Sequence, residues 1–266
     1  MGKFGRAIQT LFKALLPGRY SWPAIDIRLG GSHFHLVGSI HMGTRDMQPL
    51  PPALLKKLLQ ADALIVEADI TSGISPFGHS APCEPLESRL SPAHWQQLSK
   101  LCGELGIDTG VISTLPAWQV ALMLQAQQAQ QLGLRAEYGI DYQLLSSAHG
   151  RGQQVIELEG PQTQLSLLEA LPEGGLPLLA DTLMHWHTNA RLLQTMISWW
   201  LDVPPGNPDS PLPSTFSSGL NDLLMDSRND LWNQKLRELP AGNYVVAVGA
   251  LHLYGEHNLA DLLKKR

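Results

Sequence analysis

Two short phrases near opposite ends of the chain each place a histidine three residues after a glycine. Gly38-Ser39-Ile40-His41 follows one apolar run, and Gly249-Ala250-Leu251-His252 follows another. A neutral imidazole can bind a metal ion or transfer a proton. A lone histidine more often has a structural role. The evidence for a functional role is therefore the duplication of the phrase, together with the amphipathic stretch that follows each copy. The pattern indicates one site that receives an imidazole from each phrase.

Acidic side chains stand at the ends of two further apolar runs. Glu67 ends Leu64-Ile65-Val66-Glu67, and Glu159 ends the run that begins at Gln154. An ionised carboxylate that is buried without a partner is costly. Each side chain therefore either meets solvent at a strand end or contacts a histidine or a metal ion. Carboxylates gathered with imidazoles are typical of a metal site or of an acid–base pair.

Two more polar positions stand in predicted helices. Asp141 follows Tyr138-Gly139-Ile140 at a helix start, where the helix dipole alone would favour a carboxylate. Arg228-Asn229 lies either on an exposed helix face or in the site. There the arginine would neutralise a carboxylate cluster or hold a carboxylate of the substrate.

The elements that must position these residues alternate between strands and helices, which predicts an α/β fold with a mixed central sheet flanked by many helices. The predicted strands cover 33–40, 63–69, 154–159 and 243–249, and the predicted helices cover 49–60, 91 onward, 116–132, 139–150, 161–171, 177–201, 215–238 and 256–265. Ser91 is the expected N-cap of its helix. Open α/β sheets place ligands at the carboxyl ends of their strands. The two phrases meet there only if the last strand returns to the N-terminal part of the sheet. We therefore interpret the proline-rich segment 203–213 as a surface loop, in preference to a domain boundary.

Composition excludes several classes of protein. The 266 residues carry a net charge of −5, so there is no basic footprint for nucleic acid. Cys83 and Cys102 have no CxxC spacing, and both are expected to be reduced thiols. The chain has no P-loop, no G-x-G-x-x-G after a strand, no H-E-x-x-H and no G-x-S-x-G.

The first twenty residues have the spacing of a basic amphipathic helix. Such a helix either packs on the domain or makes peripheral contact with an anionic membrane. Lys13 interrupts the only candidate core of a signal peptide, and no apolar run approaches the roughly 20 residues that span a bilayer. The expectation is a cytoplasmic protein with a single α/β domain over 21–266 that carries helical insertions.

Together, and in this order, the motifs resemble those of the TraB/GumN family, which is similar in turn to the Tiki proteases. The resemblance covers the chain from about Trp22 to Leu263. Its marks are Gly38-Ser39-Ile40-His41, the strand that ends at Glu67, Gly139-Ile140-Asp141, Val155-Ile156-Glu157-Leu158-Glu159, Arg228-Asn229 and Gly249-Ala250-Leu251-His252. It implies one α/β domain in which both G-x-x-H phrases line a single cleft.

The resemblance also implies a divalent metal ion, with manganese or cobalt favoured. Carried over to this sequence, the metal ligands would be His41, Glu67 and His252. The cleft residues Asp141, Glu159 and Arg228 would assist, and Gly38, Gly249, Tyr138 and Asn229 would support the site.

Three functions remain open at this point. The leading hypothesis is a metal-dependent peptidase, in which the ion activates a water molecule and a cleft carboxylate accepts the proton. The second is a metal-independent, esterase-like hydrolase in which His41 acts as a base and Glu67 orients it. The third is a module that binds haem or a peptide without turnover. The expected partner is therefore a peptide or a small molecule.

Overall fold

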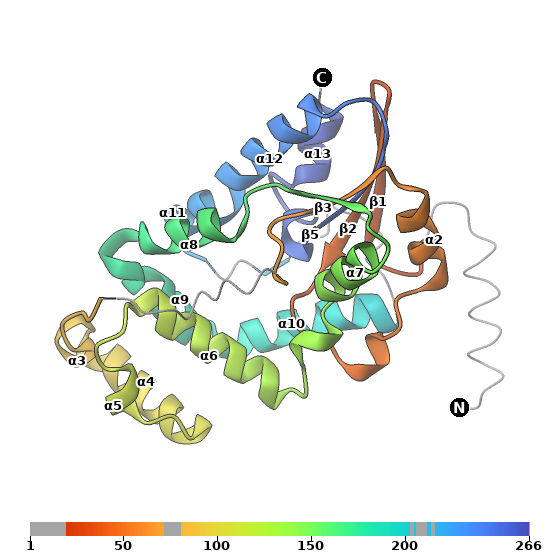
Figure 1. The fold of residues 1–266 in the computed structure, drawn as a ribbon. Coiled ribbons are helices and arrows are strands. Elements are labelled where there is room, and N and C mark those ends of the chain that lie inside the picture. The colour runs from red at the N-terminus through yellow and green to blue at the C-terminus, as the bar shows by residue number, and fades with distance from the viewer. Residues whose placement is uncertain (1–19, 72–80, 203–204, 206–211, 214–215, 266) are drawn as a thin grey trace.

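A five-stranded mixed sheet forms the centre of the molecule in the computed structural model, which describes residues 20–71, 81–202, 205, 212–213 and 216–265 (Figure 1). The strands are β1 (Ala24–Leu29), β2 (Ser32–Ser39), β3 (Ala63–Val66), β4 (Gln154–Glu157) and β5 (Asn243–Gly249). Their order is β1-β2-β5-β3-β4. Only β1 runs antiparallel to its neighbour. The predicted α/β fold with a mixed sheet is confirmed. The N-terminal amphipathic helix and most of the 203–213 loop lie outside the described residues.

The edge strand β1 is an addition to the four predicted strands. Its isoleucines alternate with Asp26 and Arg28, a pattern typical of a half-buried strand. Gly30 has a φ of 57° in the turn to β2, a conformation that glycine adopts without steric cost. The alternating pattern of β1 and the glycine turn after it together explain the β1–β2 hairpin, which the sequence analysis did not predict.

Two apolar layers cover the sheet because successive side chains of a strand point to opposite faces. On β5, Val245 and Ala247 pack in one cluster with leucines of α2 and α7, whereas Val246 and Val248 pack in the other with α12 and α13. These helices lie on opposite sides of the sheet (Figure 1). The two cores hold the strand ends, and so the residues after them, in fixed places.

Other helices form a third apolar cluster, centred on α4, α6 and α9.

The described α-helices and π-helix are α2 (Pro52–Gln60), α3 (Leu86–Arg89), α4 (Pro92–Leu105), α5 (Thr109–Ile112), α6 (Ala117–Gln131), α7 (Ile140–His149), α8 (Pro161–Glu169), α9 (Leu176–Met184), α10 (Trp186–Leu201), α11 (Ser218–Asn221), the π-helix η4 (Asp222–Asp226), α12 (Ser227–Glu238) and α13 (Leu259–Lys264). The 3-10 helices are η1 (Arg45–Met47), η2 (Ala136–Tyr138), η3 (Pro172–Gly175) and η5 (Ala250–His252).

Several predicted helices are confirmed with shifted ends. Ser91 caps α4 as expected, because its side chain accepts a hydrogen bond from the backbone of His94. The predicted stretch 177–201 is two helices that meet at His185. Cys83 and Cys102 are both free thiols. Within the described ranges, no helix is both long and apolar enough to cross a bilayer.

Candidate functional site

The two G-x-x-H phrases leave the sheet side by side. β2 and β5 are parallel neighbours, and their register pairs Ser39 with Gly249. β3 lies on the other side of β5 and ends just before Glu67, and the backbone N–H of Glu159 donates to the carbonyl of Glu67 at 2.9 Å. The predicted return of the last strand to the N-terminal strand is therefore confirmed. All four chemistry-bearing segments emerge at the carboxyl edge of the parallel strands.

The glycines of the phrases allow this close approach. The N–H of Gly249 donates to Glu67 Oε1 at 2.6 Å, and a Cβ on Gly249 would stand 3.3 Å from the same oxygen. A Cβ on Gly38 would stand 3.2 Å from Cα of Ala250 in the neighbouring phrase. Any side chain at either position would push the two phrases, or the phrase and the carboxylate, apart.

The segment that carries Asp141 is bound directly to the first phrase. The N–H of Ile140 donates to the carbonyl of Ile40 at 2.9 Å. Gly139 lies so close to the phrase that a Cβ there would collide with the carbonyl oxygen of His41. This contact explains the Gly-Ile-Asp order: the glycine permits the approach, and the aspartate two residues later reaches the histidine.

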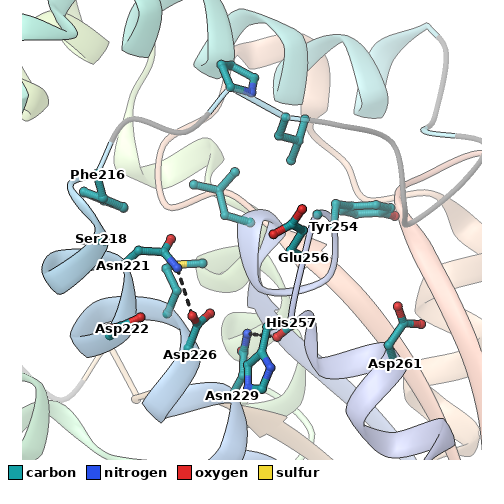
Figure 2. A pocket seen from close by; sticks show the side chains of 15 residues that line it. Phe216, Ser218, Asn221, Asp222, Asp226, Asn229, Tyr254, Glu256, His257 and Asp261 are labelled. Carbon is teal, nitrogen blue, oxygen red and sulfur yellow. Dashed lines mark hydrogen bonds between the residues drawn. The ribbon is translucent and has the colours of Figure 1, made fainter.

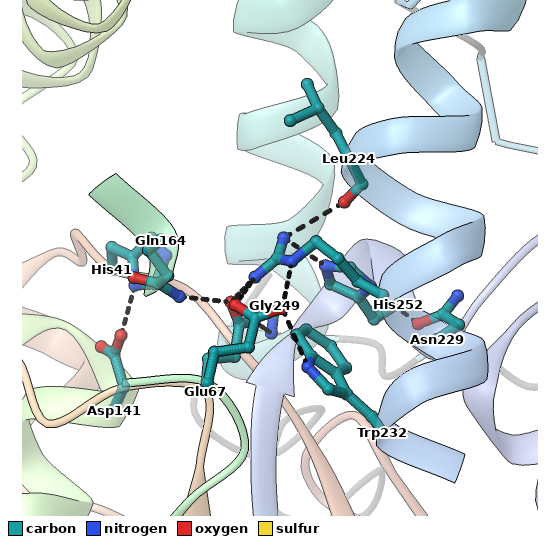
Figure 3. A network of polar contacts seen from close by, with 11 residues as sticks. His41, Glu67, Asp141, Gln164, Leu224, Asn229, Trp232, Gly249 and His252 are labelled. Carbon is teal, nitrogen blue, oxygen red and sulfur yellow. Dashed lines mark hydrogen bonds and ion pairs between the residues drawn. The ribbon is translucent and has the colours of Figure 1, made fainter. Parts of the chain in front are cut away.

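His41 and Asp141 form a hydrogen-bonded pair through Nδ1 and Oδ2 (Figure 3). The carboxylate is buried, and its other oxygen accepts from the N–H of Tyr142 at 3.0 Å. The imidazole is 65% exposed, and its Nε2 has no protein partner among the described residues. The charge of Asp141, helped by Glu67, raises the pKa of His41 to about 9, although desolvation opposes this. The residue that orients His41 is thus Asp141, whereas the second hypothesis had assigned that part to Glu67.

His252 has the opposite environment. It is buried, and its Nδ1 lies 2.8 Å from Oδ1 of Asn229. The amide of Asn229 donates from Nδ2 to the carbonyl of His257, so Oδ1 faces the imidazole and Nδ1 carries the proton. Nε2 then accepts from Nη1 of Arg228 at 3.3 Å. Burial, together with the charge of Arg228, lowers the pKa of His252 to about 3, although Glu67 opposes the shift.

Arg228 links the two carboxylates that follow β3 and β4, Glu67 and Glu159. It donates to Glu67 Oε2 at 2.7 Å and makes a two-pronged contact with Glu159 at 2.8 and 2.9 Å. Its Nη1 donates to the carbonyl of Leu224 and to His252. A guanidinium has five N–H groups, and these contacts use all five. Of the two roles proposed for this arginine, the arrangement favours neutralising a carboxylate cluster over holding a substrate carboxylate.

Glu67 stays ionised at the centre of the cluster. Burial acts to raise its pKa, but the charge of Arg228, the two histidines and the N–H of Gly249 lower it to about 2. The amide of Gln164 on α8 adds a weaker contact of 3.3 Å to Oε2. The carboxylate therefore presents a fixed negative charge between the two phrases.

Two contributors to the site were not among the predicted residues. Trp232 donates from Nε1 to Glu159 at 3.0 Å. Cζ of Arg228 lies 4.6 Å from the centroid of the indole, and the tilted ring of His252 lies 4.4 Å from it, centroid to centroid. The spacing of four residues between Arg228 and Trp232 on one helix is a signal that the sequence did offer. Gln164 carries no comparable signal. The carbonyl of Tyr138 accepts a hydrogen bond from Gln143, and its support of the site stays a prediction.

The residues implied as metal ligands do not fit a metal ion as they are placed here. Within the described part of the chain, no three or more His, Cys, Asp or Glu side chains gather as they would around an ion. The guanidinium of Arg228 lies between Glu67 and His252, in contact with both. An ion that bridged these two ligands would have to displace a positive group already bonded to each.

A separate cavity of about 700 Å³ lies on the other side of Asn229 (Figure 2). It is bounded by α11, η4, the start of α12 and the loop before α13, and it includes Phe216, Tyr254 and Glu256. His41, Glu67 and Arg228 do not line it. The cavity therefore meets the polar cluster only through the amide that holds His252.

Comparison with known proteins identifies relatives of the whole chain. Residues 24–266 match the model of the TraB/PrgY/gumN family. The chain is 58% identical over 258 residues to the uncharacterized protein YbaP of Escherichia coli (strain K12), covering 97% of this chain and 98% of that protein. It is equally similar, over the same shares, to the YbaP of Shigella flexneri. No solved structure matches the chain.

Proposed function

The chain belongs to the TraB/PrgY/gumN family, and we propose that it is a hydrolase of an acyl bond in a peptide or a small molecule. The observation that carries the proposal is the His41–Asp141 pair. It joins an exposed imidazole to a buried carboxylate at the strand edge where α/β folds place their ligands. A histidine that is oriented by an aspartate and open at its second nitrogen has the geometry of a general base.

In this mechanism the neutral His41 donates its Nδ1 proton in the hydrogen bond to Asp141 and presents the Nε2 lone pair to water. Nε2 takes a proton as the water oxygen bonds to the carbonyl carbon, and the π electrons move to the carbonyl oxygen. When the carbonyl re-forms, the bond to the leaving group breaks and Nε2 returns the proton to that group. Asp141 and the fixed charge of Glu67 stabilise the transient imidazolium.

The remaining cluster acts as a scaffold. Arg228 and Glu159 hold Glu67 in place, and Asn229 holds His252 in one tautomer. None of these steps uses a metal ion. The metal-dependent peptidase, with His41, Glu67 and His252 as ligands, stays a prediction from the family resemblance.

The test measures hydrolysis of p-nitrophenyl acetate and of a fluorogenic peptide mixture by wild type and His41→Gln. His149→Gln is the matched control, because His149 is also an exposed histidine bonded to an aspartate, Asp69, at 2.7 Å, but at the far end of α7. We expect His41→Gln alone to lose activity, by roughly 10²–10⁴-fold. Hydrolysis that survives in His41→Gln would contradict the proposal.

Metal dependence and pH separate the two mechanisms. The proposed mechanism keeps its rate in EDTA. A rate that needs added Mn²⁺, with a bound ion found by elemental analysis, would favour the metal-dependent mechanism.

With a pKa of about 9 for His41, about one molecule in a hundred carries the neutral base at pH 7. We therefore expect kcat/KM to rise about tenfold per pH unit and to level off near pH 9.

A further inference from the structure

One histidine of β2 is buried near the end of that strand that lies away from His41. His35 is 3% exposed, and both of its ring nitrogens have partners. Its Nε2 accepts a hydrogen bond from Nε1 of Trp22 at 3.1 Å, and its Nδ1 lies 2.7 Å from Oδ1 of Asp26. An indole N–H can only donate, so Nε2 must be unprotonated and the ring proton must be on Nδ1. The contacts therefore hold the neutral imidazole and no other form.

The charged groups around His35 act in both directions. Asp26 on β1 is its hydrogen-bond partner, and Lys57 of α2 and His33 of β2 approach the same carboxylate at 3.4 Å. The ring of Tyr20 lies against His35, with centroids 5.2 Å apart, and Lys57 sits over that ring. Burial first, and then Lys57 and His33, lower the pKa of His35, whereas Asp26 raises it. Together these effects favour the neutral form of His35.

The segment that carries Trp22 is bound to the first G-x-x-H phrase. The indole is 3% exposed and packs in one core cluster with Val37 and Ile40. The carbonyl of Pro23 accepts a hydrogen bond from the N–H of Gly38 at 2.9 Å. A movement of Trp22 would therefore act on Gly38 through the hydrogen bond of the adjacent Pro23, and Gly38 allows the close approach of the two phrases.

We propose that Trp22, His35 and Asp26 form an acid-sensitive latch, in which protonation of His35 Nε2 turns the indole N–H away and loosens residues 20–23 from Gly38. The reason is geometric. A protonated Nε2 would place one N–H against another in a site closed to water, and neither group could then find an acceptor. Asp26, already bonded to Nδ1, cannot accept from the opposite side of the ring. This latch does not depend on the proposed hydrolase activity.

The first test follows the unfolding equilibrium with pH in wild type, His35→Gln and His33→Gln. His35 takes up its proton near pH 6.5 when unfolded and at a lower pH when folded, so its stabilising contribution is complete above pH 6.5 and is lost as the pH falls. We expect the unfolding constant of wild type and of His33→Gln to rise by up to about tenfold per pH unit below 6.5, relative to His35→Gln. His33→Gln is the matched control, because it removes a neighbouring histidine that contacts the same carboxylate. Equal pH dependence in all three proteins would overturn the latch.

A second test needs no variant of His35 to fold. Nitrogen-15 NMR of the imidazoles should show His35 as the Nδ1–H tautomer at pH 7.5, and the indole N–H signal that Trp22→Phe removes should shift with the His35 midpoint. The indole of Trp200 donates to the carbonyl of Gly38 at 3.1 Å, so its signal should follow with the same midpoint. Protonated Nε2 at pH 7.5, or a Trp22 or Trp200 signal that ignores the titration of His35, would overturn the proposal.

Discussion

The two G-x-x-H phrases share the same pattern, but their histidines have opposite surroundings. The imidazole of His41 is exposed and faces the carboxylate of Asp141, whereas His252 is buried between the amide of Asn229 and the guanidinium of Arg228. The pKa of the first is raised to about 9, and that of the second is lowered to about 3. At neutral pH one histidine is therefore charged and the other is not.

The difference comes from what distant elements bring to each phrase. A carboxylate beside an imidazole favours the charged ring, whereas burial and a nearby cation favour the neutral ring. Asp141 belongs to α7, and Asn229 and Arg228 belong to α12. The duplicated phrase fixes where the imidazoles stand, and the helices that pack beside them fix how each can act.

The largest expected effect comes from Arg228, whose removal should erase the contrast. Arg228→Met leaves Glu67 and Glu159 as two buried carboxylates without their hydrogen-bonded cation, which should lower the free energy of unfolding by about 3–5 kcal/mol. His252 would then lose the guanidinium at its Nε2 and keep the nearby charge of Glu67, so its pKa should rise. Urea unfolding measures the first effect, and NMR titration of His252 measures the second.

Arg228→Lys is the control for charge without shape. A lysine restores the cation but has three donors where the guanidinium uses five, so we expect a loss of stability smaller than that of the methionine variant. If Arg228→Met unfolds at the urea concentration of wild type, the arginine does not hold the cluster together.

The strand ends could be predicted from the sequence because their signals are local. Apolar runs that stop at Gly38, Glu67, Glu159 and Gly249 place these residues at one edge once the strands are parallel neighbours. β1 offered only an alternating, half-exposed pattern with a weaker signal. The break at His185 had no glycine or proline to mark it.

The partners within the site could not be predicted in the same way. Asp141 stands 100 residues from His41, and nothing in either segment states which carboxylate meets which ring. The predicted strand 63–69 would carry Glu67 and Asp69 on one face, but β3 ends at Val66. Beyond that end Asp69 turns to His149, whereas Glu67 turns to Arg228. Side-chain pairing of this kind depends on helix packing, which periodicity does not encode.

A smaller effect on stability should distinguish the two histidines, because only one of them is buried. His252→Gln leaves buried groups of Asn229 and Arg228 without their partner, which should cost about 1–3 kcal/mol of unfolding free energy. His41→Gln changes an exposed side chain and should cost at most about 0.5 kcal/mol. Thermal and urea unfolding of the two variants give the comparison. Equal losses would mean that burial does not distinguish the phrases.

The smallest effect, and the sharpest test of the comparison, is to exchange the partners with Asp141→Asn and Asn229→Asp. The first removes the charge that raises the pKa of His41, so this pKa should fall toward the ordinary value, and the second should raise the pKa of His252. The raised pKa of His41 stabilises the fold below about pH 6.5, and this contribution is lost as the pH rises through about 9. Asp141→Asn should remove that pH dependence, and its cost in stability should be smaller than for a buried pair, because solvent screens an imidazole that is 65% exposed. Histidine NMR titrations of both variants decide the matter: if His41 keeps its raised pKa without the carboxylate of Asp141, the partner that each ring meets is not what separates the two phrases.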